Sequence, residues 1–198
     1  KGVEQKTDQL MSEVVLDIYP KSRIVILSGP NFSSELIANK PSATVLSSLN
    51  KKSLLDVSGL FSLERIRIYF NNDIIGTQLG GAMKNVIAIA CGFAKGKNLG
   101  ENAKAAIITR GISEIVKLGV KMGAKRKTFY GLSGIGDLAL TCSSLKSRNT
   151  KFGYDLAKGG KLLNLKANCT LEGVESCDSI CKLGQKYEVE LPLCNSVK

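Results

Sequence analysis

In the first part of the chain, up to residue 71, the spacing of hydrophobic and polar positions alternates between two periods. Apolar residues recur at helical spacing in three segments, which predicts three amphipathic helices. These segments are residues 4–18, 31–39 and 50–61. A short apolar run follows each helix and predicts a strand. The runs are residues 23–28, 43–48 and 65–70. Helices and strands in alternation are typical of a doubly wound α/β layer.

From about residue 73 onward the pattern is helical only. Asn102 is placed to cap a long helix that runs to about Met122, and Gly123 is placed to end it. We therefore expect α/β structure followed by all-α structure. The predicted domains are residues 1–71 and residues 72–198.

The composition is that of an ordinary globular protein. Hydrophobic residues make up 43% of the 198-residue chain, and no apolar run approaches the roughly 20 residues that span a bilayer, so we expect no membrane segment. The charged and polar residues 1–9 show no signal-peptide pattern. Six cysteines without a CxxC pair, together with the absence of histidine, argue against a zinc site and favour free thiols in a reducing cytoplasm.

The formal charge of +11 predicts an anionic partner without deciding which one. Lysines are spread along the chain with few aromatic residues between them, a pattern that does not favour base stacking on nucleic acid. A phosphate-bearing small molecule fits the charge equally well. Because histidine is absent, acid–base chemistry must use Lys, Asp, Glu, Tyr or Cys.

One predicted helix carries a lysine within an apolar stretch. In GGAMKNVIAIACG, residues 80–92, Lys84 has Gly80, Gly81 and Ala88 as neighbours three and four residues away. The lysine either extends its ammonium along the helix to water, or lies where small neighbours let a backbone or a ligand approach. The stretch by itself leaves both interpretations open.

Two glycine-rich stretches differ in their surroundings. GIGDLA, residues 134–139, has the spacing G-x-G-x-x-A, but TFYGLS before it does not have the pattern of a strand. We therefore reject it as a dinucleotide-binding fingerprint. SGPNF, residues 28–32, leaves a predicted strand and opens a predicted helix. Free amides at such a helix start favour an anion, although an ordinary strand–helix turn has the same pattern.

A third polar stretch, TCSSLKSRN, ends with Ser147, Arg148 and Asn149. A forked guanidinium beside neutral donors suits the oxygens of a phosphate. Upstream, Asp137 offers a carboxylate that can hold Lys84 through its charge and a hydrogen bond.

Together these motifs resemble one family. KGVE, LSGPNF, GGAMKNVIAIACG, ENAKAAIITRGISEI, GLSGIGDLALTC, SRN and LEG occur in the order found in bacterial NAD(P)-dependent glycerol-3-phosphate dehydrogenases. The resemblance implies reversible hydride transfer between dihydroxyacetone phosphate and sn-glycerol 3-phosphate in the cytoplasm, with NAD or NADP as cofactor and a role in phospholipid synthesis. It also implies that residues 1–71 are the C-terminal part of a Rossmann-type NAD-binding domain and that residues 72–198 form the substrate domain.

The resemblance further implies roles for individual residues. Lys84 and Asp137 match the family's catalytic lysine and the aspartate of its GxGDL motif. The positions that match substrate-binding residues are Lys1, Gly29, Asn31, Asp137, Ser147, Arg148 and Asn149. The positions that match cofactor-binding residues are Lys1, Ser33, Arg148, Thr170 and Glu172. The chain departs from the family's usual residues at Met83 (usually Leu), Asn31 (Ser or Thr) and Ser33 (Ala).

The main departure is the family's GxGxxG turn, which precedes the KGxE motif and is absent from this chain. Three predicted strands are also few for a sheet covered on both faces. We therefore expect the chain to lack an N-terminal part of its fold and to be inactive by itself. The preference for NAD or NADP is set after a strand that this chain lacks, and the oligomeric state, with a homodimer as one option, stays open.

Two other functions compete with this expectation. A related two-domain dehydrogenase of β-hydroxy acids would share the architecture and an essential lysine, but not the SRN phosphate group. A basic nucleic-acid-binding protein would need a compact cationic face, and its binding to DNA would be sensitive to salt and unaffected by dihydroxyacetone phosphate.

Overall fold

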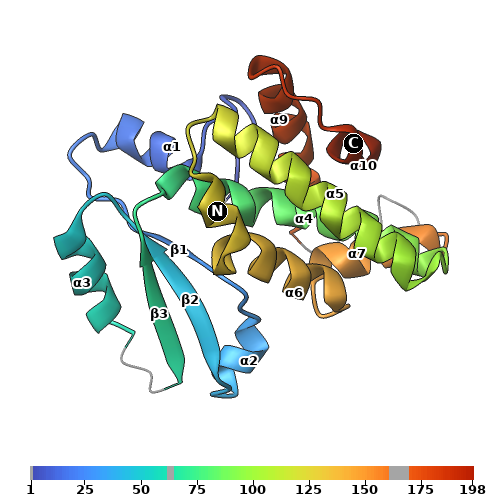
Figure 1. The fold of residues 1–198 in the computed structure, drawn as a ribbon, viewed down its shortest axis with the longest axis horizontal. Coiled ribbons are helices and arrows are strands. Elements are labelled where there is room, and N and C mark those ends of the chain that lie inside the picture. The colour runs from blue at the N-terminus through green and yellow to red at the C-terminus, as the bar shows by residue number, and fades with distance from the viewer. Residues whose placement is uncertain (1, 62–64, 161–169) are drawn as a thin grey trace.

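The computed structural model describes residues 2–61, 65–160 and 170–198 (Figure 1). In these residues, a small sheet with flanking helices is followed by a larger group of helices. The sheet has the strand order β1-β2-β3, with bounds Ile26–Ser28, Ser42–Ser47 and Ile66–Asn71. β2 and β3 are parallel, with Val45 opposite Tyr69, whereas β1 runs antiparallel to β2. All three predicted strands are confirmed, with ends that differ by at most three residues.

The helices of this first part are shorter than the sequence predicts. Their bounds are Met11–Ile18 for α1, Ser33–Ile37 for α2 and Lys51–Gly59 for α3. The prediction of helix over residues 4–10 is wrong, because Val3 and Leu10 pair as an isolated antiparallel bridge. The Glu4 carboxylate holds the turn between them by accepting hydrogen bonds from the Thr7 amide and hydroxyl. Leu10 then starts α1, since its amide donates to the Glu13 side chain.

A long central helix organises the second part. α4 (Ile74–Gly96) is capped by Asp73, whose Oδ1 accepts from the Gly76 amide. The other oxygen, Oδ2, accepts from the Lys125 amide and the Thr128 hydroxyl, which fixes the start of α4 to the segment after the next helix. The helices packed against α4 are α5 (Gly100–Lys121), α6 (Asp137–Ser143), α7 (Arg148–Ala157), α9 (Glu172–Lys186) and α10 (Pro192–Val197).

By length and composition, one helix of the described residues, α4, is long and apolar enough to cross a membrane, although no uninterrupted apolar run in it approaches roughly 20 residues. In the structure, 78% of its most apolar window is buried. Leu79, Met83 and Ile87 are fully buried in the same cluster as Val3 and Leu10. Its hydrophobicity is therefore that of a helix at the centre of a packed core.

The segment between α5 and α6 contains the first part of the glycine-rich stretch GIGDLA, residues 134–139. α5 begins two residues before the predicted cap Asn102. It ends at Lys121, one residue before the predicted end, and Gly123 follows with a φ of +93°. A 3₁₀ turn, η1 (Arg126–Tyr130), and a π-helical turn, η2 (Leu132–Gly136), then lead into α6. No strand precedes GIGDLA in this described stretch, which agrees with its rejection as a dinucleotide-binding fingerprint.

α4 and α7 approach each other at glycines. A Cβ on Gly92 would overlap the carbonyl oxygen of Thr150, and a Cβ on Gly153 would overlap that of Ile89. These positions exclude any larger residue unless the helices separate.

We predict that Gly92→Ala or Gly153→Ala lowers the free energy of unfolding by about 1–3 kcal/mol, the usual effect of forcing an extra methyl group into a packed contact. Urea unfolding of the full-length protein measures this effect. Gly59→Ala is the matched control, since nothing lies within 4 Å of a Cβ built there. Equal stabilities for all three variants would contradict the close approach of the two helices.

Candidate active site

A cleft of about 360 Å³ lies where the turn after β1 faces the helical part. One wall comes from residues 31–33 and the other walls come from α4, α6, the start of α7 and the start of α9. The residues that line it are Asn31, Phe32, Ser33, Gly81, Lys84, Asn85, Asp137, Leu140, Thr141, Lys146, Ser147, Arg148, Asn149 and Glu172. Segments far apart in the sequence thus form one polar site.

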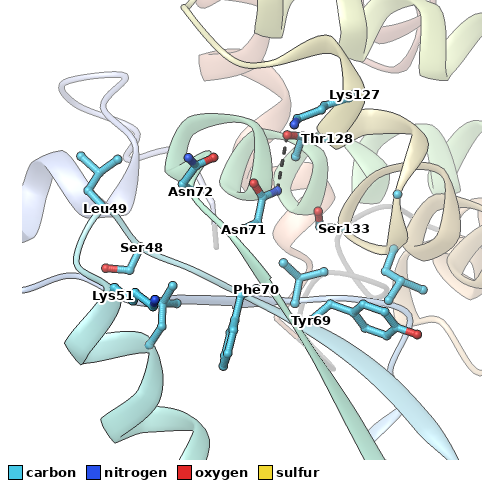
Figure 2. A pocket seen from close by; sticks show the side chains of 14 residues that line it. Ser48, Leu49, Lys51, Tyr69, Phe70, Asn71, Asn72, Lys127, Thr128 and Ser133 are labelled. Carbon is cyan, nitrogen blue, oxygen red and sulfur yellow. Dashed lines mark hydrogen bonds between the residues drawn. The ribbon is translucent and has the colours of Figure 1, made fainter.

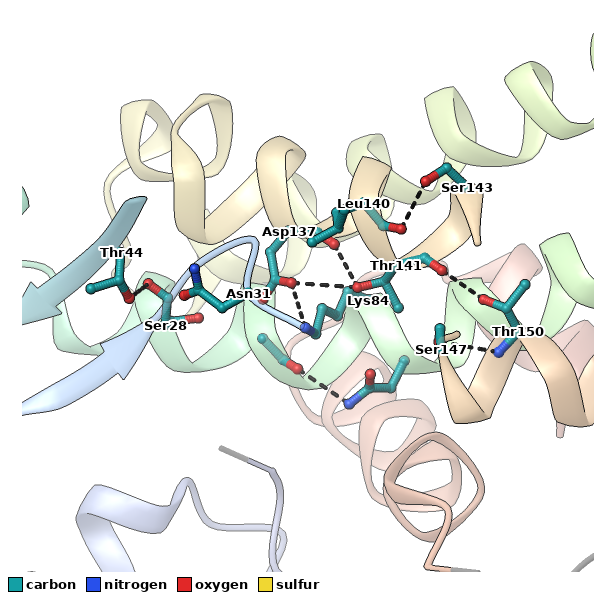
Figure 3. A network of polar contacts seen from close by, with 12 residues as sticks. Ser28, Asn31, Thr44, Lys84, Asp137, Leu140, Thr141, Ser143, Ser147 and Thr150 are labelled. Carbon is teal, nitrogen blue, oxygen red and sulfur yellow. Dashed lines mark hydrogen bonds and ion pairs between the residues drawn. The ribbon is translucent and has the colours of Figure 1, made fainter. Parts of the chain in front are cut away.

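The central feature of the cleft is an ion pair between Lys84 and Asp137 (Figure 3). Lys84 Nζ lies 2.5 Å from Asp137 Oδ1, and their side chains are 15% and 2% exposed. The Thr141 hydroxyl, one turn further along α6, lies 3.4 Å from the same oxygen. The second oxygen, Asp137 Oδ2, is buried without a hydrogen-bond partner. Buried polar atoms are normally paired, so this oxygen is one of the few exceptions among the described residues.

Small residues on α4 make this pair geometrically feasible. A Cβ on Gly80 would lie 2.5 Å from the Ser133 carbonyl oxygen, so only glycine lets the η2 turn pack this close. That contact brings Asp137, which follows η2, alongside Lys84. Gly81 lines the cleft itself. The small neighbours of Lys84 therefore do what the second interpretation requires. At Gly80 another backbone segment approaches the helix, and at Gly81 the cleft adjoins it.

The Ser147–Asn149 segment starts α7 and joins it to α9. Ser147 Oγ caps α7 by accepting from the Thr150 amide at 3.3 Å. Asn149 Oδ1 accepts from the Gly173 amide at 3.0 Å, so it caps α9 from a neighbouring helix. Arg148 Nη2 lies 2.7 Å from Glu172 Oε1, and the Arg148 side chain is 55% exposed. The guanidinium therefore keeps donors free for an anion.

The opposite wall is the turn from β1 to α2. The Asn31 side-chain amide donates to the Ala43 carbonyl at 3.0 Å, which ties the turn to β2. Gly29 packs tightly on β2, where an added Cβ would lie 3.1 Å from the Thr44 Cα. Asn31 and Ser33 line the cleft, whereas Gly29 is not among the lining residues.

A larger cavity of about 930 Å³ lies elsewhere, at the carboxyl ends of β2 and β3 (Figure 2). Tyr69, Phe70, Lys51 and Lys127 are among its lining residues, and the Asn71 amide donates to the Thr128 hydroxyl at 3.4 Å. No carboxylate lines it among the described residues. It therefore lacks a lysine–carboxylate pair like that of Lys84 and Asp137, and the smaller cleft is the candidate active site.

None of the cysteines that the structure describes lines the candidate site. The five cysteines of the described residues are free and buried. Burial is the main cause that raises the pKa of the Cys177 thiol to about 12, so this thiol stays protonated at neutral pH. The described residues contain no cluster of three acidic, Cys or His side chains that could hold a metal ion.

Comparison with known proteins places these features in a family. The family description "NAD-dependent glycerol-3-phosphate dehydrogenase C-terminus" matches residues 73–198, and the corresponding N-terminus description matches residues 1–54. The chain belongs to this family.

Individual relatives agree with this assignment. A glycerol-3-phosphate dehydrogenase [NAD(P)+] of Corynebacterium aurimucosum is 48% identical over all of this chain and 61% of its own length, and one of Clostridium tetani is 39% identical over 57% of its length. The crystal structure of glycerol-3-phosphate dehydrogenase from Coxiella burnetii superposes with a TM-score of 0.96 at 38% identity, over all of this chain and 61% of that one. The chain thus spans about three fifths of the length of these relatives.

Most residues expected from the family resemblance meet in the cleft. Those that line it are Asn31, Ser33, Lys84, Asp137, Ser147, Arg148, Asn149 and Glu172. Thr170 is exposed and does not line it, and Lys1 lies outside the described residues. The sequence reasoning missed Asn85, Thr141 and Lys146, although each had a signal: Asn85 follows Lys84, Thr141 stands one helical turn after Asp137, and Lys146 precedes Ser147.

The contact of Asn149 with α9 gives a stability prediction. We expect Asn149→Ala to lower the free energy of unfolding by about 1–3 kcal/mol, because it leaves the buried Gly173 amide without an acceptor. Asn149→Asp keeps an acceptor at the helix start and should cost less than the alanine variant. Thermal or urea unfolding of the two variants checks the order, and an aspartate variant less stable than the alanine one would contradict it.

Proposed function

We propose that the protein carrying this chain is an NAD(P)-dependent glycerol-3-phosphate dehydrogenase, which transfers hydride reversibly between dihydroxyacetone phosphate and sn-glycerol 3-phosphate. The observation that carries the proposal is the Lys84–Asp137 ion pair in a cleft that is also lined by the exposed guanidinium of Arg148. Family membership supports the same reaction. We further propose that the enzyme acts in the cytoplasm and supplies the backbone of phospholipids.

In the reducing direction, negative charge develops on the C2 oxygen of dihydroxyacetone phosphate. The Lys84 ammonium stabilises this charge by a hydrogen bond and delivers the proton from Nζ. In the oxidising direction, neutral Lys84 takes the proton of the C2 hydroxyl. Asp137 Oδ1 fixes the position of Nζ by accepting its hydrogen bond.

The start of α7 holds the phosphate. The guanidinium of Arg148 provides charge and parallel donors, and the Ser147 hydroxyl adds a neutral donor. Binding energy at this remote group holds the reacting carbonyl against Lys84, which raises the rate as well as the affinity.

NAD or NADP supplies the hydride when bound. Ser33, Arg148 and Glu172 fit such a group, because a hydroxyl and a guanidinium offer donors to phosphate oxygens and a carboxylate offers an acceptor to hydroxyl groups. Arg148 and Glu172 already contact each other, so they would face both ligands at one place.

Oxidation of NADH or NADPH by the full-length protein, followed with dihydroxyacetone phosphate as substrate, tests the proposed function. We expect turnover with this phosphate ester and little with β-hydroxy acids. Turnover of β-hydroxy acids without use of dihydroxyacetone phosphate would favour the related dehydrogenase class instead. Salt-sensitive DNA binding without any turnover would favour the nucleic-acid-binding alternative.

For the catalytic group, we predict that Lys84→Met in the full-length enzyme lowers kcat by at least about 10²–10⁴-fold, since both proton transfer and charge stabilisation are lost. Cofactor affinity, measured by NADH fluorescence, should change little, and this binding also shows that the variant is folded. A kcat within tenfold of the wild-type value would contradict the catalytic role and favour a Lys84 ammonium that only extends along the helix to water.

For the phosphate, we predict that Arg148→Lys weakens kcat/KM for dihydroxyacetone phosphate by about ten- to a hundredfold or more, the effect of losing roughly 1.5–3 kcal/mol from a charged hydrogen bond. The lysine ammonium keeps the positive charge but lacks the two parallel N–H donors of a guanidinium. Unphosphorylated dihydroxyacetone, a poor substrate from the start, serves as the control and should be used equally by both proteins. Equal losses on the two substrates would exclude Arg148 as the phosphate ligand.

A further inference from the structure

One ion pair joins the two walls of the cleft. Lys146 Nζ lies 2.9 Å from Glu35 Oε1, and the two residues are 111 positions apart in sequence. Lys146 lines the cleft and directly precedes Ser147, whereas Glu35 belongs to α2, two residues after Ser33. Among the ion pairs of the described residues, this is the one that connects the α/β part to the helical part.

The α2 wall depends on few other contacts. α2 has five residues, none of them buried, and its N-cap Phe32 makes no side-chain capping bond. Ile37 at its end is 86% exposed. The Asn31–Ala43 hydrogen bond anchors only the start of this segment. An element with so little buried surface is easily displaced, so a single ion pair has a large influence on its position.

The Glu35 carboxyl is ionised at neutral pH. The hydrogen bond from Lys146 is the largest of the causes that hold the pKa of the Glu35 carboxyl below its ordinary value, and the positive charge of Lys146 adds to it. Such an exposed pair adds little to global stability. Its consequence is local, because one partner stands on each side of the site.

We propose that Glu35 and Lys146 form a clasp that positions the α2 wall against the start of α7, so that both act as positioning residues for substrate and cofactor. This inference rests on the proposed function. Ser33 on one side and Ser147 with Arg148 on the other reach a common ligand only while the two walls are held together. Without the clasp, α2 moves away and ligands bind more weakly, while the Lys84–Asp137 pair is unaffected.

The test is a charge swap in the full-length enzyme. Glu35→Lys and Lys146→Glu, each alone, should raise the KM for dihydroxyacetone phosphate or NADH about five- to tenfold with a smaller change in kcat, since attraction across the cleft becomes repulsion. The double variant restores the pair with reversed polarity and should return KM to within about threefold of wild type. Lys151→Glu with Asp155→Lys is the matched control, because that pair, 3.0 Å apart on α7, has no residue in the cleft, and KM should stay near wild type.

Two results would overturn the clasp. Single variants with wild-type KM would show that the pair positions nothing. A Lys146→Glu defect that Glu35→Lys does not relieve would show that Lys146 binds the substrate phosphate directly.

Hydrogen exchange provides a readout that does not need catalysis. Amides of residues 33–37 should exchange several-fold faster in Lys146→Glu and return to the wild-type rate in the double variant. Unchanged exchange in the single variant would overturn the clasp even in an active enzyme. Altered exchange in a protein that does not use dihydroxyacetone phosphate would instead uphold the clasp and refute the proposed function, so the two failures are distinguishable.

Discussion

The close packing of other backbones on α4 is the constraint on which the site depends. At Gly80 the η2 turn lies against the helix, and at Gly92 the carbonyl of Thr150 does the same. The contact at Gly80 places Asp137 next to Lys84. The contact at Gly92 holds α7 in place, and the Ser147–Asn149 segment stands at the start of that helix. The Lys84–Asp137 pair and the Ser147–Asn149 segment are therefore both positioned by how closely other backbone can approach one helix.

The electrostatics of the cleft follow from this geometry. A carboxylate that is 2% exposed is stabilised by the Lys84 ammonium, while its second oxygen is buried without a hydrogen-bond partner. Two further cations, Arg148 and Lys146, are each paired with a carboxylate on a different element, Glu172 and Glu35. The cations are thus held in place by partners that are themselves exposed and able to adjust when an anion binds.

Much of this arrangement could be predicted from the sequence. Three strands and the buried character of the helix that carries Lys84 follow from periodicity, and the family resemblance indicated eight of the cleft residues. The prediction that a helix starts at residue 4 was wrong because the Glu4 carboxylate accepts hydrogen bonds from Thr7 and stabilises a turn instead. Hydrophobic periodicity gives no signal for such local side-chain hydrogen bonds, which compete with helix formation. Likewise, the role of Asn149 as a cap for α9, and the Lys146–Glu35 pair, depend on tertiary contacts between distant segments. The division into domains at residues 71 and 72 remains a prediction, and the burial of Val3 and Leu10 with α4 shows that the N-terminal segment contributes to the helical core.

The central claim is that the Lys84 ammonium meets the substrate while Asp137 holds it in place. A ¹H–¹⁵N spectrum selective for lysine ammonium groups, recorded on the full-length protein during titration with dihydroxyacetone phosphate, tests this directly. The signal of Lys84 is identified by its absence from Lys84→Arg. We expect this signal to shift as the site fills, with the same midpoint as substrate binding measured by calorimetry. A Lys84 signal that stays unchanged while the substrate binds would contradict it.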